Sequence, residues 1–253
     1  MLATHLSLLA SASSDPITLV RLSIALAPVA LVIGIFWRWS IGPWFAVYSI
    51  ARMLTQLLLV GYVLTFVFQA QQPWTVLAVL TVMVLAASSI ALRTVADGSW
   101  ARFWHAAGSI ALGSLVGLAF ATQGVLSVEP WFAPREVVAL AGMAISNAMN
   151  AVSLAAERLA AETAAGKPYP QARSTAYRTS MIPGINALLA VGIVSFPGAM
   201  TGQILEGADP LAAARFQIMV MCMVFTSNGI AAACYLALSR DGRLPTNRTD
   251  KNG

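Results

Sequence analysis

Charged residues are scarce in this chain of 253 residues: Asp, Glu, Lys and Arg make up only 10% of it, whereas 58% of the residues are hydrophobic. A soluble domain carries roughly 25% charged residues, so this composition excludes an ordinary globular protein. The sequence instead predicts an all-α polytopic membrane protein, embedded in a lipid bilayer. Little length remains for a soluble domain, so an ATPase module would have to lie on another chain.

Metal-binding and nucleophilic residues are equally rare, because the chain has only two cysteines and two histidines. Cys222 and Cys234 are separated by about 120° of rotation on a helix, so we expect neither a disulfide nor a shared metal site between them. His5 and His105 are isolated. The chain also lacks the GxxxxGKS or GxxxxGKT loop that cradles nucleotide phosphates. We therefore predict no enzymatic activity and no cofactor on this chain, and we assign no metal ligand.

Apolar segments dominate the rest of the sequence. A hydrocarbon core about 30 Å thick requires about 20 apolar residues per helix. We predict seven such spans: Ile17–Trp37, Phe45–Phe68, Trp74–Leu92, Trp104–Ala121, Val137–Ala155, Ile182–Leu205 and Leu211–Ser239. They form a single transmembrane domain over residues 1–240, and the tail, 241–253, is predicted to be cytoplasmic and disordered.

The basic residues indicate the orientation of the spans. Four of them, Arg158, Lys167, Arg173 and Arg178, lie in the fifth loop, and others lie in the first loop, the third loop and the tail. The second and sixth loops have no Lys or Arg, and the fourth has only Arg135. The positive-inside rule therefore places the N-terminus outside and the C-terminus inside. The net charge of +5 is then a topology signal, and we expect no nucleic-acid partner.

The sixth span is interrupted by helix-breaking residues. Irregular backbone survives at membrane depth only inside protein or beside a water-filled cavity, and interrupted spans indicate the pathway of a transporter. The sequence therefore predicts a helix broken by proline and glycine that faces a watery passage. The alternative is a packing kink between helices. The interrupting residues are Pro183, Gly184, Pro197, Gly198 and Gly202.

Polar side chains within the spans are the candidates for a substrate pathway. Asn147 and Asn150 share one face of the fifth span, where amides either join helices or line a polar path. Further polar groups flank the breaks of the sixth span or lie in the seventh: Asn186, Ser195, Thr201, Gln203 and Gln217. Alternate positions on a helix point about 200° apart, so Met219, Met221 and Met223 are not expected to form one site.

The fifth loop, residues 157–180, is the longest predicted cytoplasmic loop, and we call it the coupling segment. It begins as a helix, breaks at Gly-Lys-Pro-Tyr-Pro and continues as a basic helical stretch. A short rigid helix between two spans is what a permease needs to dock a soluble motor subunit. The alternative is an ordinary basic loop. The candidate coupling residues are Glu157, Arg158, Glu162, Gly166, Lys167 and Pro170.

Three stretches carry a resemblance to a known family: ARMLTQLLLVGYVLTFVF, SNAMNAVSLAAERL and MIPGINALLAVGIVSFPGAMTGQILEGADPLAAARFQIMV. They resemble the FetB-like permeases assigned to iron-export ABC transporters, which are related to permeases of a plant aluminium-tolerance system. The resemblance runs from about Ile17 to Arg240. It also places Met200 beside the breaks, so the pathway candidates become Asn147, Asn150, Asn186, Ser195, Pro197, Gly198, Met200, Thr201, Gln203 and Gln217.

The resemblance implies a permease homodimer in the bacterial plasma (inner) membrane. It also implies a separate ATP-binding subunit that supplies ATP and Mg, and export of a metal ion such as iron. Plant relatives have instead been linked to nucleotide-sugar export, so the substrate stays open. The coupling segment is shorter than is usual in the family, which implies weaker docking, a dedicated ATPase or a missing one.

An ATP-independent channel or secondary transporter for a small solute is the alternative function. Such a transporter generally needs an acidic residue within the membrane to bind a coupling ion. Here the acidic residues from Asp97 to Asp209 lie at span ends or in loops. Proton coupling is therefore disfavoured, and the ABC permease is the leading hypothesis.

Overall fold

The computed structural model describes residues 19–40, 42–69, 72–93 and 99–240. The regular elements in these ranges are all helices, accompanied by one isolated bridge between Val191 and Ser195. The chain forms two compact units, Met1–Phe66 and Val67–Gly253. The predicted tail, 241–253, lies outside the described residues, and the prediction of one domain over 1–240 stays a prediction.

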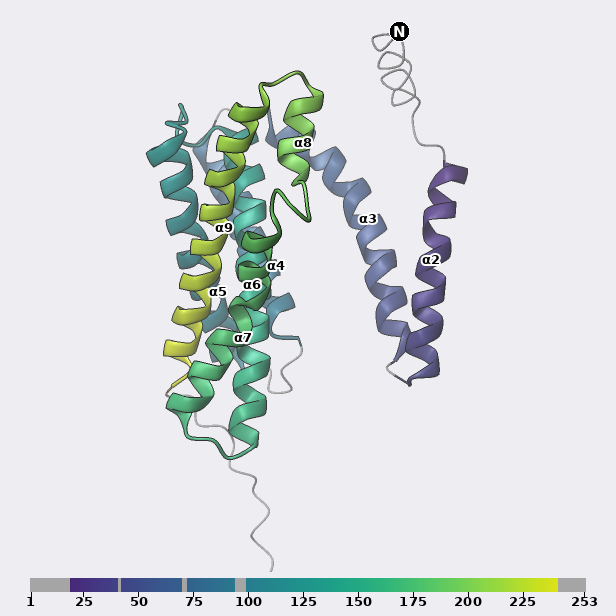
Figure 1. Ribbon diagram of the computed structural model, residues 1–253, viewed down its shortest axis with the longest axis vertical. Coiled ribbons are helices and arrows are strands. Elements are labelled where there is room, and N and C mark those ends of the chain that lie inside the picture. The colour runs from purple at the N-terminus through teal and green to yellow at the C-terminus, as the bar shows by residue number, and fades with distance from the viewer. Residues whose placement is uncertain (1–18, 41, 70–71, 94–98, 241–253) are drawn as a thin grey trace, which may run out of the picture. The chain divides into compact units, whose positions relative to one another are not determined.

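The first unit is a helical hairpin of α2 (Leu19–Arg38) and α3 (Pro43–Val67) (Figure 1). Ser40 and Gly42, on either side of the hairpin turn, both have a positive φ, of 56° and 76°. Large apolar side chains of α3, such as Leu57 and Leu58, are exposed. Exposed leucines on an apolar helix are compatible with lipid, where no water has to be ordered around them.

The second unit contains the remaining elements, which appear in Figure 1 from teal to yellow. They are α4 (Pro73–Ala91), α5 (Trp100–Ala119) with its π-helical continuation η1 (Phe120–Val125), α6 (Pro134–Ala164), α7 (Tyr169–Ala190), α8 (Gly198–Leu205) and α9 (Pro210–Leu238). Ser99 and Asp209 cap the starts of α5 and α9 by accepting hydrogen bonds from the amides of Arg102 and Ala212.

Five helices in the described ranges are long and apolar enough to cross a membrane: Pro43–Val67, Pro73–Ala91, Trp100–Val125, Pro134–Ala164 and Pro210–Leu238. A shorter apolar stretch, Leu26–Arg38, lies in α2. The all-helical, apolar architecture agrees with the expected polytopic membrane protein. The count of seven spans and their orientation stay predictions.

Small residues allow the helices of the second unit to approach closely. Helix α9 packs against α5, α6, α7 and α8, and its most extensive contacts are with α5 and α6. One stripe of α6 is made of buried alanines, Ala144, Ala148, Ala151 and Ala155. Such small side chains bring helix backbones together where a membrane offers no hydrophobic driving force between helices.

The closest approach joins α5 to α9 at the sequence GSLVG, where Gly113 and Gly117 are four residues apart. A Cβ at Gly113 would lie 2.6 Å from the carbonyl oxygen of Ser227 and 2.8 Å from the backbone nitrogen of Ala231. A Cβ at Gly117 would overlap the Ser227 hydroxyl and lie 2.8 Å from the carbonyl oxygen of Met223. Only glycine fits at these two positions without moving a helix.

The predicted break in the sixth span is confirmed at one of its two positions. Residues 191–197 separate α7 from α8, and Gly192 there has a φ of +82°. The second predicted break, at Pro183 and Gly184, was wrong, because α7 continues through both residues. Proline removes one helical hydrogen bond, but the helix, 22 residues long, continues to Ala190 on the far side of it. The predicted basic helical stretch and the following apolar residues thus form one helix.

Candidate functional site

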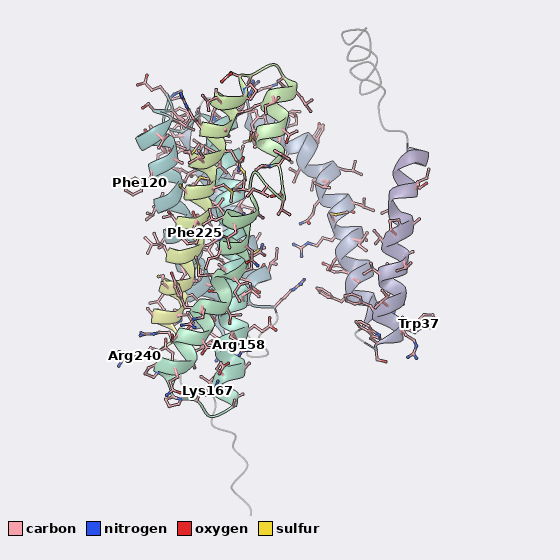
Figure 2. All side chains as sticks on the ribbon, viewed as in Figure 1. Trp37, Phe120, Arg158, Lys167, Phe225 and Arg240 are labelled. Carbon is pink, nitrogen blue, oxygen red and sulfur yellow. The ribbon has the colours of Figure 1, made fainter. Side chains whose placement is uncertain are left out.

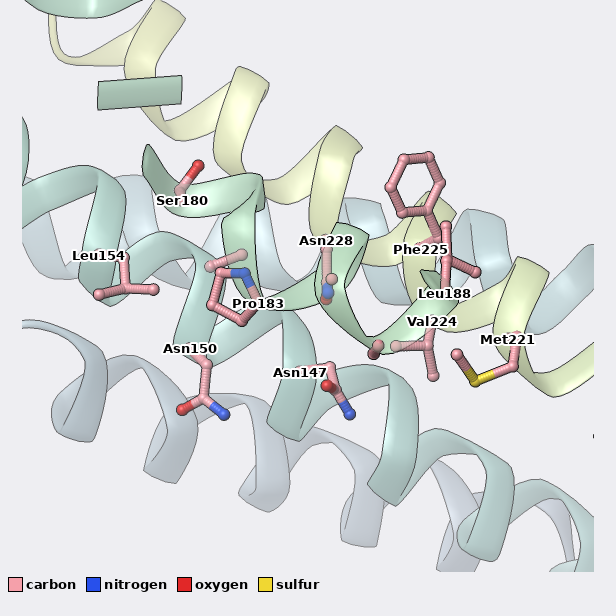
Figure 3. A pocket seen from close by; sticks show the side chains of 13 residues that line it. Asn147, Asn150, Leu154, Ser180, Pro183, Leu188, Met221, Val224, Phe225 and Asn228 are labelled. Carbon is pink, nitrogen blue, oxygen red and sulfur yellow. The ribbon is translucent and has the colours of Figure 1, made fainter. Parts of the chain in front are cut away.

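A pocket between α6, α7 and α9 is lined by polar side chains from all three helices (Figure 3). Helix α6 contributes Asn147 and Asn150, α7 contributes Ser180, and α9 contributes Asn228. The volume is about 80 Å³, which suffices for several water molecules because one needs about 10–15 Å³. Pro183, Gly184, Ala187, Leu188, Met221, Val224 and Phe225 are among the uncharged residues that complete the lining.

The carboxamides of Asn147 and Asn228 differ in their hydrogen bonds. The amide nitrogen of Asn147 donates to the carbonyl of Met143, 2.9 Å away on the same helix, which leaves its Oδ1 available. Asn228 is only 5% exposed, and its Oδ1 is buried with no hydrogen-bond partner among the described residues. An unpaired buried acceptor is uncommon in proteins, because its lost hydration is not replaced.

Two residues of α7 shape the pocket around Asn228. A Cβ at Gly184 would lie 3.3 Å from the amide nitrogen of Asn228, so the absence of a side chain makes room for this carboxamide. Pro183 has no N–H and cannot donate to the carbonyl of Thr179, four residues earlier. The proline that was expected to break the helix therefore removes a backbone donor close to the pocket.

The coupling segment forms the end of α6, a tight turn and the start of α7. Helix α6 has 31 residues and is about 46 Å long, which exceeds the thickness of a hydrocarbon core. Glu162, near its end, is only 4% exposed. Its Oε1 lies 2.5 Å from Nη2 of Arg158 and its Oε2 lies 2.5 Å from Nζ of Lys167.

The Arg158–Glu162 pair lies within α6, whereas the Glu162–Lys167 pair connects the end of α6 to the turn between the two helices. Gly166 has a φ of +77°, a conformation that favours glycine. Its amide donates to the carbonyl of Thr163 at 3.0 Å, and the amide of Lys167 donates to the carbonyl of Glu162 at 3.2 Å. The expected helix, break and second helix are therefore present. Glu162 is a buried residue that stabilises this turn, and its side chain is not exposed for docking.

A further bond connects the coupling segment to α9. The hydroxyl of Tyr169, the first residue of α7, donates to the carbonyl of Leu236 near the end of α9. Figure 2 shows Arg158 and Lys167 at the same end of the second unit as Arg240. The coupling segment is thus attached to α6, α7 and α9, the three helices that line the pocket.

The described residues offer no cluster of three or more His, Cys, Asp or Glu side chains that could hold a metal ion. The pocket instead provides neutral carboxamide oxygens and one hydroxyl, that of Ser180, which already donates to the carbonyl of Tyr177 at 2.8 Å. Neutral oxygens can hydrogen-bond water or coordinate a hard cation. These groups suit reversible binding and provide no nucleophile activated by a base.

Comparison with known proteins identifies the family. A family model described as Uncharacterised protein family (UPF0014) matches residues 19–242. The chain belongs to this family. Relatives from Synechocystis and Bacillus subtilis are named UPF0014 membrane proteins, which agrees with the apolar helices of this chain. The FetB-like resemblance noted in the sequence is therefore confirmed. The chain is an integral membrane protein of a permease family.

Curated relatives of this UPF0014 chain come from bacteria and plants. A UPF0014 membrane protein of Synechocystis is 33% identical over 74% of this chain and 78% of its own. The Escherichia coli relative, named Probable iron export permease protein FetB, is 31% identical over 75% and 78%. Protein ALUMINUM SENSITIVE 3 of Arabidopsis thaliana is 32% identical over 70% and 69%. No solved structure matches.

The structure separates the predicted pathway residues into two groups. Asn147 and Asn150 line the pocket. The other eight lie outside it, most of them on α7, α8 and the break between them: Asn186, Ser195, Pro197, Gly198, Met200, Thr201, Gln203 and Gln217. Gln217 is buried on α9 with an unpaired Oε1 among the described residues. A pathway role for these eight residues stays a prediction.

Sequence reasoning did not select Asn228, Ser180 or Gly184 as site residues. The available signal was that Asn228 shares a helix face with Gln217, a polar position within an apolar span. The expectation for the methionines is confirmed: Met221 lines the pocket, whereas Met219 and Met223 line a separate cavity beside α5 and η1.

Proposed function

We propose that this chain is the membrane-spanning permease subunit of an ABC transporter that exports a metal ion such as iron. The observation that carries the proposal is the similarity to FetB over 75% of the chain. ATP and Mg are bound by a separate subunit, and two copies of this chain form the permease. The complex lies in the bacterial inner membrane, with the N-terminus outside and the coupling segment in the cytoplasm, as the basic loops indicate.

The attachment of the coupling segment supports a mechanism for energy transfer. The ATPase docks at the turn around Gly166, where Lys167 and Pro170 are exposed. Because the Glu162–Lys167 ion pair connects the turn to α6 and the Tyr169 hydroxyl connects α7 to α9, a displacement of the turn tilts these helices together. The pocket between the same helices then opens toward alternate sides of the membrane as the ATPase closes and releases.

Co-expression with an ABC-type ATPase subunit tests the proposal. We expect the ATPase to co-purify with a tagged chain, and the complex in liposomes to hydrolyse ATP faster when Fe²⁺ is supplied on the cytoplasmic side. If another solute stimulated ATP hydrolysis and iron did not, the chain would still be an ABC permease, but its substrate would not be iron. Iron flux without ATP, together with no association of the ATPase, would favour the channel or secondary transporter.

A further inference from the structure

We propose that a groove on the second unit binds an anionic phospholipid, whose phosphate contacts Arg215 and one of whose acyl chains lies along the groove. This groove, which we call the η1 groove, is the cavity where α5 and η1 lie beside α9. Gly117, Phe120 and Gly124 line it on one side, and Arg215 and Thr226 line it on the other. The inference goes beyond the proposed function, because it requires only an integral membrane protein and no transport.

The size and the lining of the η1 groove suit a hydrocarbon chain. Its volume is about 480 Å³, within the range of about 300–1,000 Å³ for pockets that hold organic molecules. The lining is apolar apart from Arg215, Thr226 and the weakly polar Cys222. Phe120 and Ile218 are 71% and 64% exposed, and Phe120 projects outward from the second unit (Figure 2). Because exposed apolar side chains of membrane helices contact acyl chains, a lipid can enter the groove from the bilayer.

The length of the η1 groove matches the depth of one lipid leaflet. Arg215 and Thr226 are 11 positions apart on α9, which corresponds to about 16 Å along the helix axis. One leaflet contributes about 15 Å to a hydrocarbon core about 30 Å thick. If α9, with 29 residues, is centred in the bilayer, Arg215 lies about 14 Å from the midplane and Thr226 about 3 Å from it. The guanidinium is then at the level where phosphates begin, and the groove extends toward the ends of the acyl chains.

The charge of the lining determines which headgroup fits. Arg215 is exposed, and no ion pair joins it to an acidic side chain among the residues that the structure describes. None of the residues that line the groove is an Asp or a Glu. A guanidinium binds two phosphate oxygens at once, whereas the cationic group of a zwitterionic lipid would lie beside it with no carboxylate to balance the charge. The groove therefore favours a phospholipid with a net negative charge.

The π-helical turn η1 contributes the open side of the groove. The amide of Leu126 donates to the carbonyl of Ala121, five residues earlier, at 3.0 Å. Such π-helical turns are rare and often occur at functional sites. A Cβ at Gly124 would have only the Phe120 ring within 4 Å, at 3.9 Å. A larger side chain at Gly124 would therefore occupy the groove without overlapping a helix backbone.

Native mass spectrometry of the full-length chain, with dioleoyl phosphatidylglycerol and dioleoyl phosphatidylcholine supplied in equal amounts, tests the site. We expect the unaltered chain to retain phosphatidylglycerol about fivefold over phosphatidylcholine, the effect of one arginine near an anionic membrane surface. Arg215→Gln should abolish this preference, and Arg215→Lys should keep most of it because lysine retains the charge. Equal retention of the two lipids by the unaltered chain, or an unchanged preference in Arg215→Gln, would overturn the proposal.

Gly124→Leu tests whether the acyl chain lies in the groove, since the added side chain should displace it and lower the retained phosphatidylglycerol severalfold. The matched control is Gly108→Leu, whose side chain enters a different cavity, between α4, α5 and α6, and whose Cβ has nothing within 4 Å. The control for charge is Arg135→Gln, an exposed arginine of α6 outside the groove. Equal losses in Gly124→Leu and Gly108→Leu, or in Arg215→Gln and Arg135→Gln, would reject the site.

A second copy of this chain is the other occupant that the η1 groove can accept. In that case Gly124→Leu would convert a dimer into a monomer, and neither Gly124→Leu nor Arg215→Gln would change the lipid preference; that result would reject the lipid. If Gly124→Leu folds poorly, the two variants of the exposed Arg215 decide the matter by themselves, because their side chains are not packed in the core.

Discussion

The glycine contact between α5 and α9 predicts a stability difference between two alanine substitutions on one helix. Gly113→Ala would place a Cβ 2.6 Å from the Ser227 carbonyl oxygen, 0.8 Å short of the 3.4 Å at which ordinary contact begins. The nearest atoms are backbone atoms of Ser227 and Ala231 and the Cβ of Ala231. Because no side-chain rotation relieves such an overlap, α5 and α9 must move apart.

The matched control is Gly108→Ala, since a Cβ at Gly108 has nothing within 4 Å. Both substitutions lie in α5, so the gain of helix propensity, up to about 1 kcal/mol for alanine over glycine, is common to both and cancels in the comparison. The overpacking cost, typically about 1–3 kcal/mol, remains. Gly113→Ala should therefore be less stable than Gly108→Ala by about 1–3 kcal/mol.

Unfolding in mixed micelles, titrated with sodium dodecyl sulfate and followed by circular dichroism, measures the difference in the free energy of unfolding. Gly117→Ala provides an internal check, because one of its overlaps is with the Ser227 hydroxyl. Ser227→Ala should recover part of the loss in Gly117→Ala but none of the loss in Gly113→Ala, whose contact is with the backbone. Equal stability of Gly113→Ala and Gly108→Ala would refute the close packing of α5 on α9.

Three further predictions concern coupling and the break. Glu162→Gln should lower ATPase co-purification severalfold, because it weakens the ion pair with Lys167 that holds the turn and the pair with Arg158 within α6. The control is Glu157→Gln, an exposed position on the same helix; equal losses in the two variants would contradict the role assigned to Glu162. Tyr169→Phe removes the hydrogen bond to the Leu236 carbonyl. ATP hydrolysis in the complex should persist while the amount transported per ATP falls, as measured by flux and phosphate release. An unchanged ratio of transport to ATP hydrolysis would argue that the movement of the turn does not reach α9 through this bond. The double variant Pro197→Ala/Gly198→Leu should extend α8 into the break and block flux at normal expression, and normal flux would make the break merely structural.

Rules that depend only on nearby residues were sufficient to predict the helices and the turns from the sequence. Five long apolar helices, the break near Gly192 and the turn at Gly166 follow from hydropathy, proline placement and the φ values that glycine tolerates. These properties depend on residues a few positions apart, so they can be read without knowing which helices are neighbours. The same rules overstated the effect of Pro183, because the loss of one hydrogen bond does not end a long helix that is otherwise intact.

Packing decided which polar residues meet. Asn147 and Asn150 were recognisable as one face of a helix, but the pocket exists because α7 and α9 bring Ser180 and Asn228 to that face. The fit of Gly113 against Ser227 was likewise decided by a neighbouring helix. A one-dimensional pattern states which side of a helix is polar or small. The opposing surface, and hence the site, is determined only when the helices are assembled.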